Sequence, residues 1–131
     1  MRASEVMIAD PIVVAAGATS SEVAALMRTK NISVVPVVDN PKDRHYLGTI
    51  SDRDIVTECV GLGHDPGDCS VQDHARTDTP VVKPETELQG YKVPKQADHH
   101  VRTTIVVLDG DKRVVGFIPH PEDVQGVIIA P

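Results

Sequence analysis

Residues 48–56 read Gly-Thr-Ile-Ser-Asp-Arg-Asp-Ile-Val, a stretch that predicts a strand running directly into a helix. Ser51 and Asp54 have the spacing of a capping box, in which each side chain satisfies a free backbone N–H group at the helix start. These N–H groups and the helix dipole attract anions. Ser51 could therefore contact a phosphate or ribose oxygen, and the Asp54 carboxylate suits a ribose diol. An ordinary helix cap, worth about 1 kcal/mol, explains the same two residues without a ligand.

A second, weaker copy of this stretch and of the residues before it lies later in the chain. The paired positions, 68 or 69 residues apart, are Pro11 with Pro80, residues 37–38 with 106–107, and Gly48 with Gly116. Self-similarity of this kind indicates two structural repeats. We expect the repeats at residues 1–60 and 71–131, with the turn-rich residues 61–70 as the connection between them.

The first repeat predicts the order strand, helix, strand, strand, helix. These elements are expected at residues 11–14, 19–31, 34–38, 46–50 and from 51 onwards. Thr19 and Glu22 form a capping box that opens the first helix. Pro36 interrupts the apolar run of the second strand and favours a strand start or a sheet edge. Val23, Leu26 and Met27 are expected on one face of the first helix, and the second helix carries the apolar residues Ile55, Val56 and Cys59.

The second repeat follows the same order less well. Residues 81–82 are extended, and a helix is expected to start at residues 86–88. Gly90 and Pro94 then fall inside that helix, where glycine costs about 1 kcal/mol and proline about 3 kcal/mol, so the helix should be short, kinked or displaced. Two strands at 105–108 and 114–118, joined by an Asp-Gly-Asp turn, are predicted to form a hairpin.

The chain resembles a pair of cystathionine β-synthase-type (CBS) domains. The resemblance rests on residues 32–39, Ile-Ser-Val-Val-Pro-Val-Val-Asp, with residues 48–56, and less strongly on residues 100–107 and 116–124. It implies an α+β fold in which tandem β-α-β-β-α repeats pack sheet to sheet about a pseudo-two-fold axis. It also implies a homodimer and a regulatory role, with AMP, ADP, ATP or S-adenosylmethionine as the bound ligand.

The resemblance also implies roles for individual residues. In the G-x-x-[ST]-x-x-D pattern of the family, Asp54 would hold the ribose and Ser51 would lie beside it. Val13 and Val35 would flank the purine, and Arg102 would reach the phosphates, unless it is simply an exposed surface arginine.

The second cleft departs from the family pattern. Pro119 replaces the hydroxyl residue that matches Ser51, and Glu122 replaces the acid that matches Asp54. We therefore expect one competent cleft, in the first repeat, and a degenerate second repeat whose cleft is weak or empty. The helices after Asp54 and Glu122 are the elements that the family uses for dimerisation.

A rival pattern of thiols and imidazoles spans the connection. Cys59, His64, Cys69 and His74 follow one another at intervals of five residues, and two thiolates with two imidazoles make a tetrahedral zinc set. The spacing differs from the usual zinc motifs, and Cys59 as a small core residue with the other three in a solvated loop explains the pattern without a metal. The alternative function is therefore a zinc-stabilised or ligand-free scaffold for protein interaction, and zinc belongs to that alternative only.

Composition excludes several classes of protein. The net charge of −6 and the total of three aromatic residues (two Tyr, one Phe, no Trp) argue against a nucleic-acid partner. No apolar run approaches the roughly 20 residues of a membrane span. The N-terminus lacks a signal-peptide pattern, and two cysteines make no disulfide framework, so we expect a cytoplasmic protein. The nucleophile-elbow, Walker and zinc-protease motifs are missing, and we predict no enzyme activity.

The expectation as a whole is a stand-alone, cytoplasmic and homodimeric sensor. An adenosine-containing ligand would bind in the first cleft and change the conformation or the assembly state of the protein. An unknown protein partner would read that change, because a ligand shifts an equilibrium only by binding one state better than the other.

Overall fold

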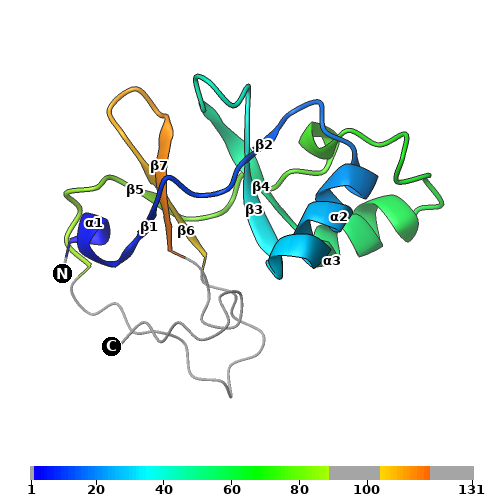
Figure 1. Ribbon diagram of the computed structural model, residues 1–131, viewed down its shortest axis with the longest axis horizontal. Coiled ribbons are helices and arrows are strands. Elements are labelled where there is room, and N and C mark those ends of the chain that lie inside the picture. Colours follow the sequence, from blue (N-terminus) through cyan, green and yellow to red (C-terminus); the bar gives the residue numbers. More distant parts are fainter. Residues whose placement is uncertain (1, 89–103, 119–131) are drawn as a thin grey trace, which may run out of the picture.

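The computed structural model describes residues 2–88 and 104–118. Two sheets lie side by side, and the longer helices cover the outer face of one of them (Figure 1). The elements in chain order are α1 (Ala3–Val6), β1 (Ile8–Ala9), β2 (Val14–Ala15), α2 (Ser20–Lys30), β3 (Val34–Val38), β4 (Tyr46–Ser51), α3 (Asp52–Asp54), the π-helix η1 (Ile55–Val60), the 3-10 helix η2 (Val71–Asp73), β5 (Val81–Val82), β6 (Ile105–Leu108) and β7 (Val114–Ile118).

The two sheets repeat one pairing pattern. In the first sheet β2 is parallel to β3 and β3 is antiparallel to β4. In the second sheet β5 is parallel to β6 and β6 is antiparallel to β7, as the hairpin prediction required. The α+β fold expected from the sequence is therefore confirmed.

The register of the second repeat differs by one residue from the sequence alignment of the repeats. Val37 lies opposite Gly48 in the first sheet, and Val107 lies opposite Gly116 in the second. Val37 therefore corresponds to Val107, and the pairing of Val37 with Val106 was wrong. The correction matters because a slip of one residue moves a side chain to the other face of the sheet.

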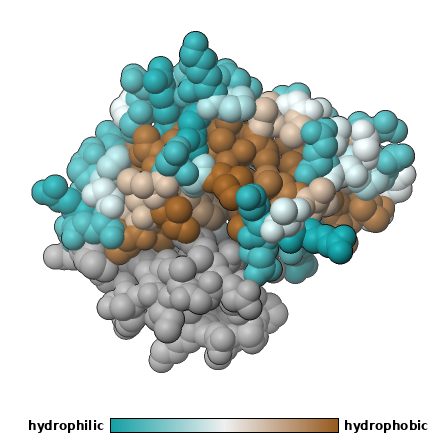
Figure 2. Space-filling view, in the orientation of Figure 1, coloured by the Kyte–Doolittle hydropathy of each residue, from teal (hydrophilic) through white to brown (hydrophobic). Residues whose placement is uncertain are grey.

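The central strand β3 contributes to two cores, one on each face. Val35 and Val37 are fully buried with α2, in a cluster that also holds Val23 and Met27. Alternate residues point the other way, as strand geometry requires. The interface cluster holds Val34 and Val38 from β3 with Val106, Val114 and Phe117 from the second sheet. The two sheets thus pack against each other, and apolar side chains gather in the middle of the face shown in Figure 2.

Pro36 lies inside the central strand, which corrects the expectation of a strand start or edge. Its partner Thr49 directs its own N–H and C=O groups to Arg76, so this position needs no donor from β3. On the other side, β2 pairs only with Val37 and Val38. Proline is tolerated here because neither neighbouring strand offers a carbonyl group that needs a hydrogen bond from this position.

The N-terminal segment joins the second sheet rather than the first. β1 pairs antiparallel with β7, with Ile8 opposite Phe117. The N–H groups of Ala3 and Ser4 at the start of α1 donate to the carbonyl oxygens of Thr86 and Pro84, both at 2.9 Å. The repeat boundaries at residues 60 and 71 stay a prediction.

The helix expected to start at residues 86–88 is not formed there. Glu87 makes an isolated antiparallel bridge with Arg2 instead. The Thr86 hydroxyl accepts a hydrogen bond from the N–H of Lys83 at 3.0 Å, which closes a turn before it. The carbonyl groups of this segment are used to hold the N-terminus, so they are lost to a helix. Gly90 and Pro94 lie outside the described residues.

Both predicted helix starts in the first repeat are confirmed. Thr19 and Glu22 form a reciprocal capping box at α2, which ends at Asn31 in the left-handed conformation. The second helix begins at α3 and continues as a π-helix, whose wide turn is uncommon in proteins. Of the apolar residues in this helix, Ile55 and Cys59 are buried, whereas Val56 is 60% exposed.

The connection after the first repeat is anchored to α2. The carbonyl groups of Pro66 and Cys69 accept hydrogen bonds from the N–H groups of Ser21 and Ser20, at 3.0 and 2.9 Å. Val71, fully buried, adds its side chain to the core around α2. In residues 2–88 and 104–118, no helix has the length and apolar character needed to cross a membrane.

Candidate functional site

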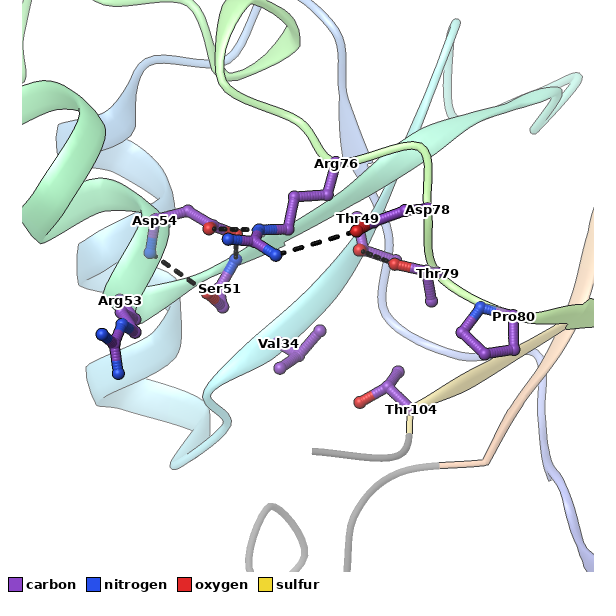
Figure 3. Close-up of a pocket in the computed structure, with 10 residues that line it drawn as sticks. All are labelled: Val34, Thr49, Ser51, Arg53, Asp54, Arg76, Asp78, Thr79, Pro80 and Thr104. Atoms are coloured by element: carbon purple, nitrogen blue, oxygen red, sulfur yellow. Dashed lines mark hydrogen bonds and ion pairs between the residues drawn. The ribbon is translucent and has the colours of Figure 1, made fainter. Parts of the chain in front are cut away.

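A polar cavity of about 440 Å³ lies where the end of β4 faces the segment that leads into β5. Cavities that hold small ligands measure roughly 300–1,000 Å³, so one nucleoside monophosphate is of a suitable size. Figure 3 shows its lining side chains, which come from both repeats. They are Val34, Thr49, Ser51, Arg53, Asp54, Arg76, Asp78, Thr79, Pro80 and Thr104.

Ser51 and Asp54 meet at one end of this cavity. The Ser51 hydroxyl accepts a hydrogen bond from the N–H of Asp54 at 3.1 Å, and the Asp54 Oδ2 atom accepts one from the N–H of Ser51 at 2.9 Å. This reciprocal capping box fixes both side chains beside the cavity. The Asp54 side chain is only 5% exposed, so its carboxylate is held in one orientation.

Arg76 pairs with that carboxylate, a contact that the sequence analysis missed. Its Nε atom lies 2.9 Å from Oδ1 of Asp54, and its Nη1 atom lies 3.9 Å from Oδ2 of Asp78. The hydrogen bond to Asp54 raises the pKa of the Arg76 guanidinium above its usual value. Figure 3 shows the guanidinium between the two acids. No spacing rule could have found the pair, because its members are 22 positions apart in the chain.

The opposite wall of the cavity joins the two repeats. The hydroxyl groups of Thr49 and Thr79 are hydrogen-bonded at 2.6 Å. Thr104 lies next to Val34, and its hydroxyl is buried without a hydrogen-bond partner among the described residues. A buried hydroxyl left unpaired costs free energy. A polar ligand atom in the cavity would remove that cost.

The remaining residues predicted for the site lie elsewhere. Val35 is fully buried on the helix-facing side of β3, and it is the neighbouring Val34 that lines the cavity. Val13 packs against the cluster between the two sheets and is not among the lining residues. Arg102 lies outside the described residues, as do Pro119 and Glu122.

Three of the four residues of the zinc alternative converge. The Sγ atoms of Cys59 and Cys69 and a ring nitrogen of His74 all lie within 4.8 Å of one another. His64 is exposed nearby, and its ring centroid lies 6.2 Å from that of His74. Cys59 comes from η1, and the other two come from the connection and from the end of η2.

The two thiols form a buried pair. Their Sγ atoms are 3.0 Å apart and both cysteines are free of disulfides. The hydrogen bond with Cys59, together with burial, raises the pKa of the Cys69 thiol to about 11. A metal ion would reverse this effect, because zinc binds the thiolate form and displaces the proton.

Comparison with known protein families identifies one domain in the first half of the chain. The CBS domain model matches residues 3–61. Residues 3–61 therefore form a CBS domain. The second half repeats the same strand pairing in its own sheet. Comparison with curated proteins finds no match.

Several solved structures share the fold over nearly the whole chain. Hypoxic Response Protein I, solved with two coordinated zinc ions, has a TM-score of 0.74 and 24% identity, covering 98% of this chain and 100% of that one. Staphylococcus aureus OpuCA has a TM-score of 0.66 and 29% identity, covering 92% and 94%. CbpB, solved in complex with c-di-AMP, has a TM-score of 0.72 and 18% identity, covering 93% and 81%.

Proposed function

We propose that this protein is a regulatory module that binds an adenosine-containing ligand in the cavity at Ser51 and Asp54. The observation that carries the proposal is the Asp54 carboxylate, which is fixed, almost fully buried, and placed at the wall of a ligand-sized polar cavity. Each of its oxygens accepts one hydrogen bond from the protein. A carboxylate has about four acceptor positions, so capacity remains for the two hydroxyls of a ribose.

Arg76 supplies the charge that a phosphate requires. Its side chain is 59% exposed and lies over Asp54, so it can turn from the carboxylate toward a ligand without breaking the core. The sequence-based candidate for this contact, Arg102, stays a second prediction. On the other side of the cavity, Val34 and Pro80 offer apolar surface to a purine. The flanking roles expected of Val13 and Val35 stay predictions.

Similar structures support the ligand class. CbpB was solved with c-di-AMP, a molecule built from two adenosine units. A shared ribose and adenine would account for recognition of AMP, ADP, ATP or S-adenosylmethionine alike at one Asp54-centred cavity. The choice among them depends on what lies beyond the ribose.

Calorimetric titration tests the proposal. Purified protein is titrated with AMP, ADP, ATP and S-adenosylmethionine in turn, and we expect one ligand per chain for at least one of them. Asp54→Asn keeps the shape of the side chain but loses the anionic acceptor, so it should lose the ribose-dependent affinity. Circular dichroism checks that this variant is folded. Silence from all four compounds, or full affinity in a folded Asp54→Asn protein, would remove the assignment.

The same proposal includes a homodimer that signals by changing shape. The outer face of η1 and the turn after it carry three exposed apolar residues, Val56, Val60 and Leu62. Large exposed apolar side chains that lie together mark interaction surfaces. A second copy covering this face, a protein partner that reads the change, a cytoplasmic location and the lack of enzyme activity are parts of this proposal.

A zinc-stabilised scaffold is the second candidate function. The observation that favours it is the convergence of Cys59, Cys69 and His74 on one point, three of the four residues in the zinc alternative. Hypoxic Response Protein I, whose fold this chain shares, was solved with two coordinated zinc ions. Metal analysis of purified protein tests it: about one zinc per chain supports the site, and no zinc after loading and dialysis rejects it.

A further inference from the structure

The thiol and imidazole cluster and the ligand cavity are built on the same two pieces of chain. Asp54 and Cys59 lie on one continuous helical segment, formed by α3 and η1. His74 and Arg76 lie two residues apart on the segment that follows η2. The cavity contact joins Asp54 to Arg76, and the cluster joins Cys59 to His74. One helix and one strap, residues 69–76, are therefore fastened together at two neighbouring points.

We propose that a zinc ion held by Cys59, Cys69 and His74 fixes this strap and thereby tightens the nucleotide cavity. The proposal rests on the ligand site and on the zinc site proposed above. Zinc bonds to sulfur measure about 2.3 Å and bonds to imidazole nitrogen about 2.0–2.1 Å, so one ion can reach ligand atoms that lie within 4.8 Å of one another. The ion would act on the position of Arg76, without entering the cavity.

The cavity end of the strap is held by one exposed ion pair and by backbone hydrogen bonds to β4. Arg76 reaches Asp54 through a side chain that is 59% exposed, and water screens such an ion pair. The backbone adds two hydrogen bonds between Thr49 and Arg76, at 2.9 and 2.7 Å. Metal–thiolate bonds are much stronger than these contacts and supply folding energy directly. A bound ion would therefore restrict the strap at a point two residues from Arg76.

A strap that is already ordered costs a ligand less to organise. Preorganisation raises ligand affinity because a segment that is already ordered loses less conformational entropy on binding. Thermodynamic linkage then requires the effect to be mutual, so the nucleotide must raise zinc affinity by the same factor. Both directions can be measured on the full chain.

The first experiment is titration with AMP of metal-stripped and zinc-loaded protein. Couplings of this kind commonly change affinity by about 5-fold or more, and we expect zinc to lower the Kd for AMP by at least that factor. Zinc affinity, measured by competition with a chromogenic chelator, should rise by the same factor in saturating AMP. Equal AMP affinity with and without zinc would overturn the proposal.

A histidine variant with a matched control locates the effect. His74→Asn should abolish zinc binding and reduce AMP affinity to that of the stripped protein, whether or not zinc is added. His45→Asn, at a histidine that pairs with Asp39 on the β3–β4 hairpin, should leave both affinities unchanged. If His74→Asn fails to fold, Cys59→Ser takes its place. An intact zinc effect on AMP binding in a folded His74→Asn protein would contradict the site.

Hydrogen exchange separates the failure of this inference from the failure of the proposed ligand. Without any nucleotide, zinc should slow exchange at the amides of Thr49 and Arg76, while the amides of the β6–β7 hairpin serve as an internal reference. If zinc slows exchange but AMP binds neither the metal-stripped nor the zinc-loaded protein, the adenosine ligand is rejected. The effect of the metal on the strap is then still supported. Unchanged exchange in zinc-loaded protein, or no zinc binding at all, would overturn the inference.

Discussion

The guanidinium of Arg76 covers the carboxylate of Asp54, with Nε 2.9 Å from Oδ1, although the two side chains differ sharply in exposure. The Asp54 side chain is 5% exposed and the Arg76 side chain is 59% exposed. A buried anion is thus balanced by a cation that remains in contact with water. In the proposed site this exposure would allow Arg76 to exchange Asp54 for a ligand phosphate, and it leads to the first prediction.

Removing the cation should destabilise the protein only modestly. We expect Arg76→Gln to lower the free energy of unfolding by about 1 kcal/mol, because one partner is exposed and solvent screens the pair. Urea denaturation measures the loss. Arg53→Gln is the control, since Arg53 lies in the same cavity lining on the exposed side of the helix. In the proposed site Arg76→Gln should also reduce the affinity for AMP more than the affinity for adenosine. An equal loss of affinity for both ligands would argue against a phosphate contact.

The two capping boxes of the first repeat offer a matched pair of variants. Ser51→Ala and Thr19→Ala each remove one side-chain cap, so each should cost about 1 kcal/mol of stability. Only Ser51 lines the cavity. Thermal denaturation should therefore show similar losses of stability in the two variants. Nucleotide titration should show weaker binding for Ser51→Ala alone. Equal affinities in the two variants would reduce Ser51 to a helix cap.

The glycines at corresponding positions of the two sheets should respond differently to alanine. At Gly48 an added Cβ would lie 2.5 Å from the carbonyl oxygen of Arg76, and the backbone cannot move aside without breaking the bridge to Thr49. At Gly116 the obstacle is the side chain of Met7, whose flexible end can rotate away while its Cβ, 3.0 Å from the added atom, needs only a small shift. Gly48→Ala should thus be the more destabilising change in urea denaturation. A larger loss for Gly116→Ala would show that the strap is easily displaced.

The fourth member of the thiol and imidazole set can be assigned by substitution. A structural zinc site uses four protein ligands, whereas three ligands leave one position for water. If His64 completes the set, His64→Asn should weaken zinc binding at least 10-fold in a chelator competition. His45→Asn again provides the control. Unchanged zinc affinity in His64→Asn would mean that Cys59, Cys69 and His74 hold the ion with water.

The apolar face of η1 predicts the assembly state. Val60 is 51% exposed and Val56 is 60% exposed, so a charge placed there should disturb an interface without entering the core. Val60→Lys should convert a dimer to a monomer in sedimentation velocity. Val81→Lys, at an apolar residue on β5 that is 47% exposed, serves as the control. A dimer that survives Val60→Lys would place the interface elsewhere.

Local sequence rules determined much of the first repeat and one hairpin of the second. The capping boxes at Thr19 and Ser51, the end of α2 at Asn31 and the β6–β7 hairpin all follow from interactions between residues that are close in the chain. The proximity of Cys59 and Cys69 is also compatible with their positions in the sequence, because they lie at opposite ends of one short connection.

The tertiary structure decided what depends on distant contacts. The pairing of Arg76 with Asp54, the burial of Pro36 inside a central strand and the bridge of Glu87 to Arg2 each join segments that local periodicity cannot relate. The alignment of the repeats failed by one residue for the same reason. Sequence similarity does not show which face of the sheet a side chain occupies. The packing of Val34 against the second sheet and of Val35 against α2 determines the face for each residue.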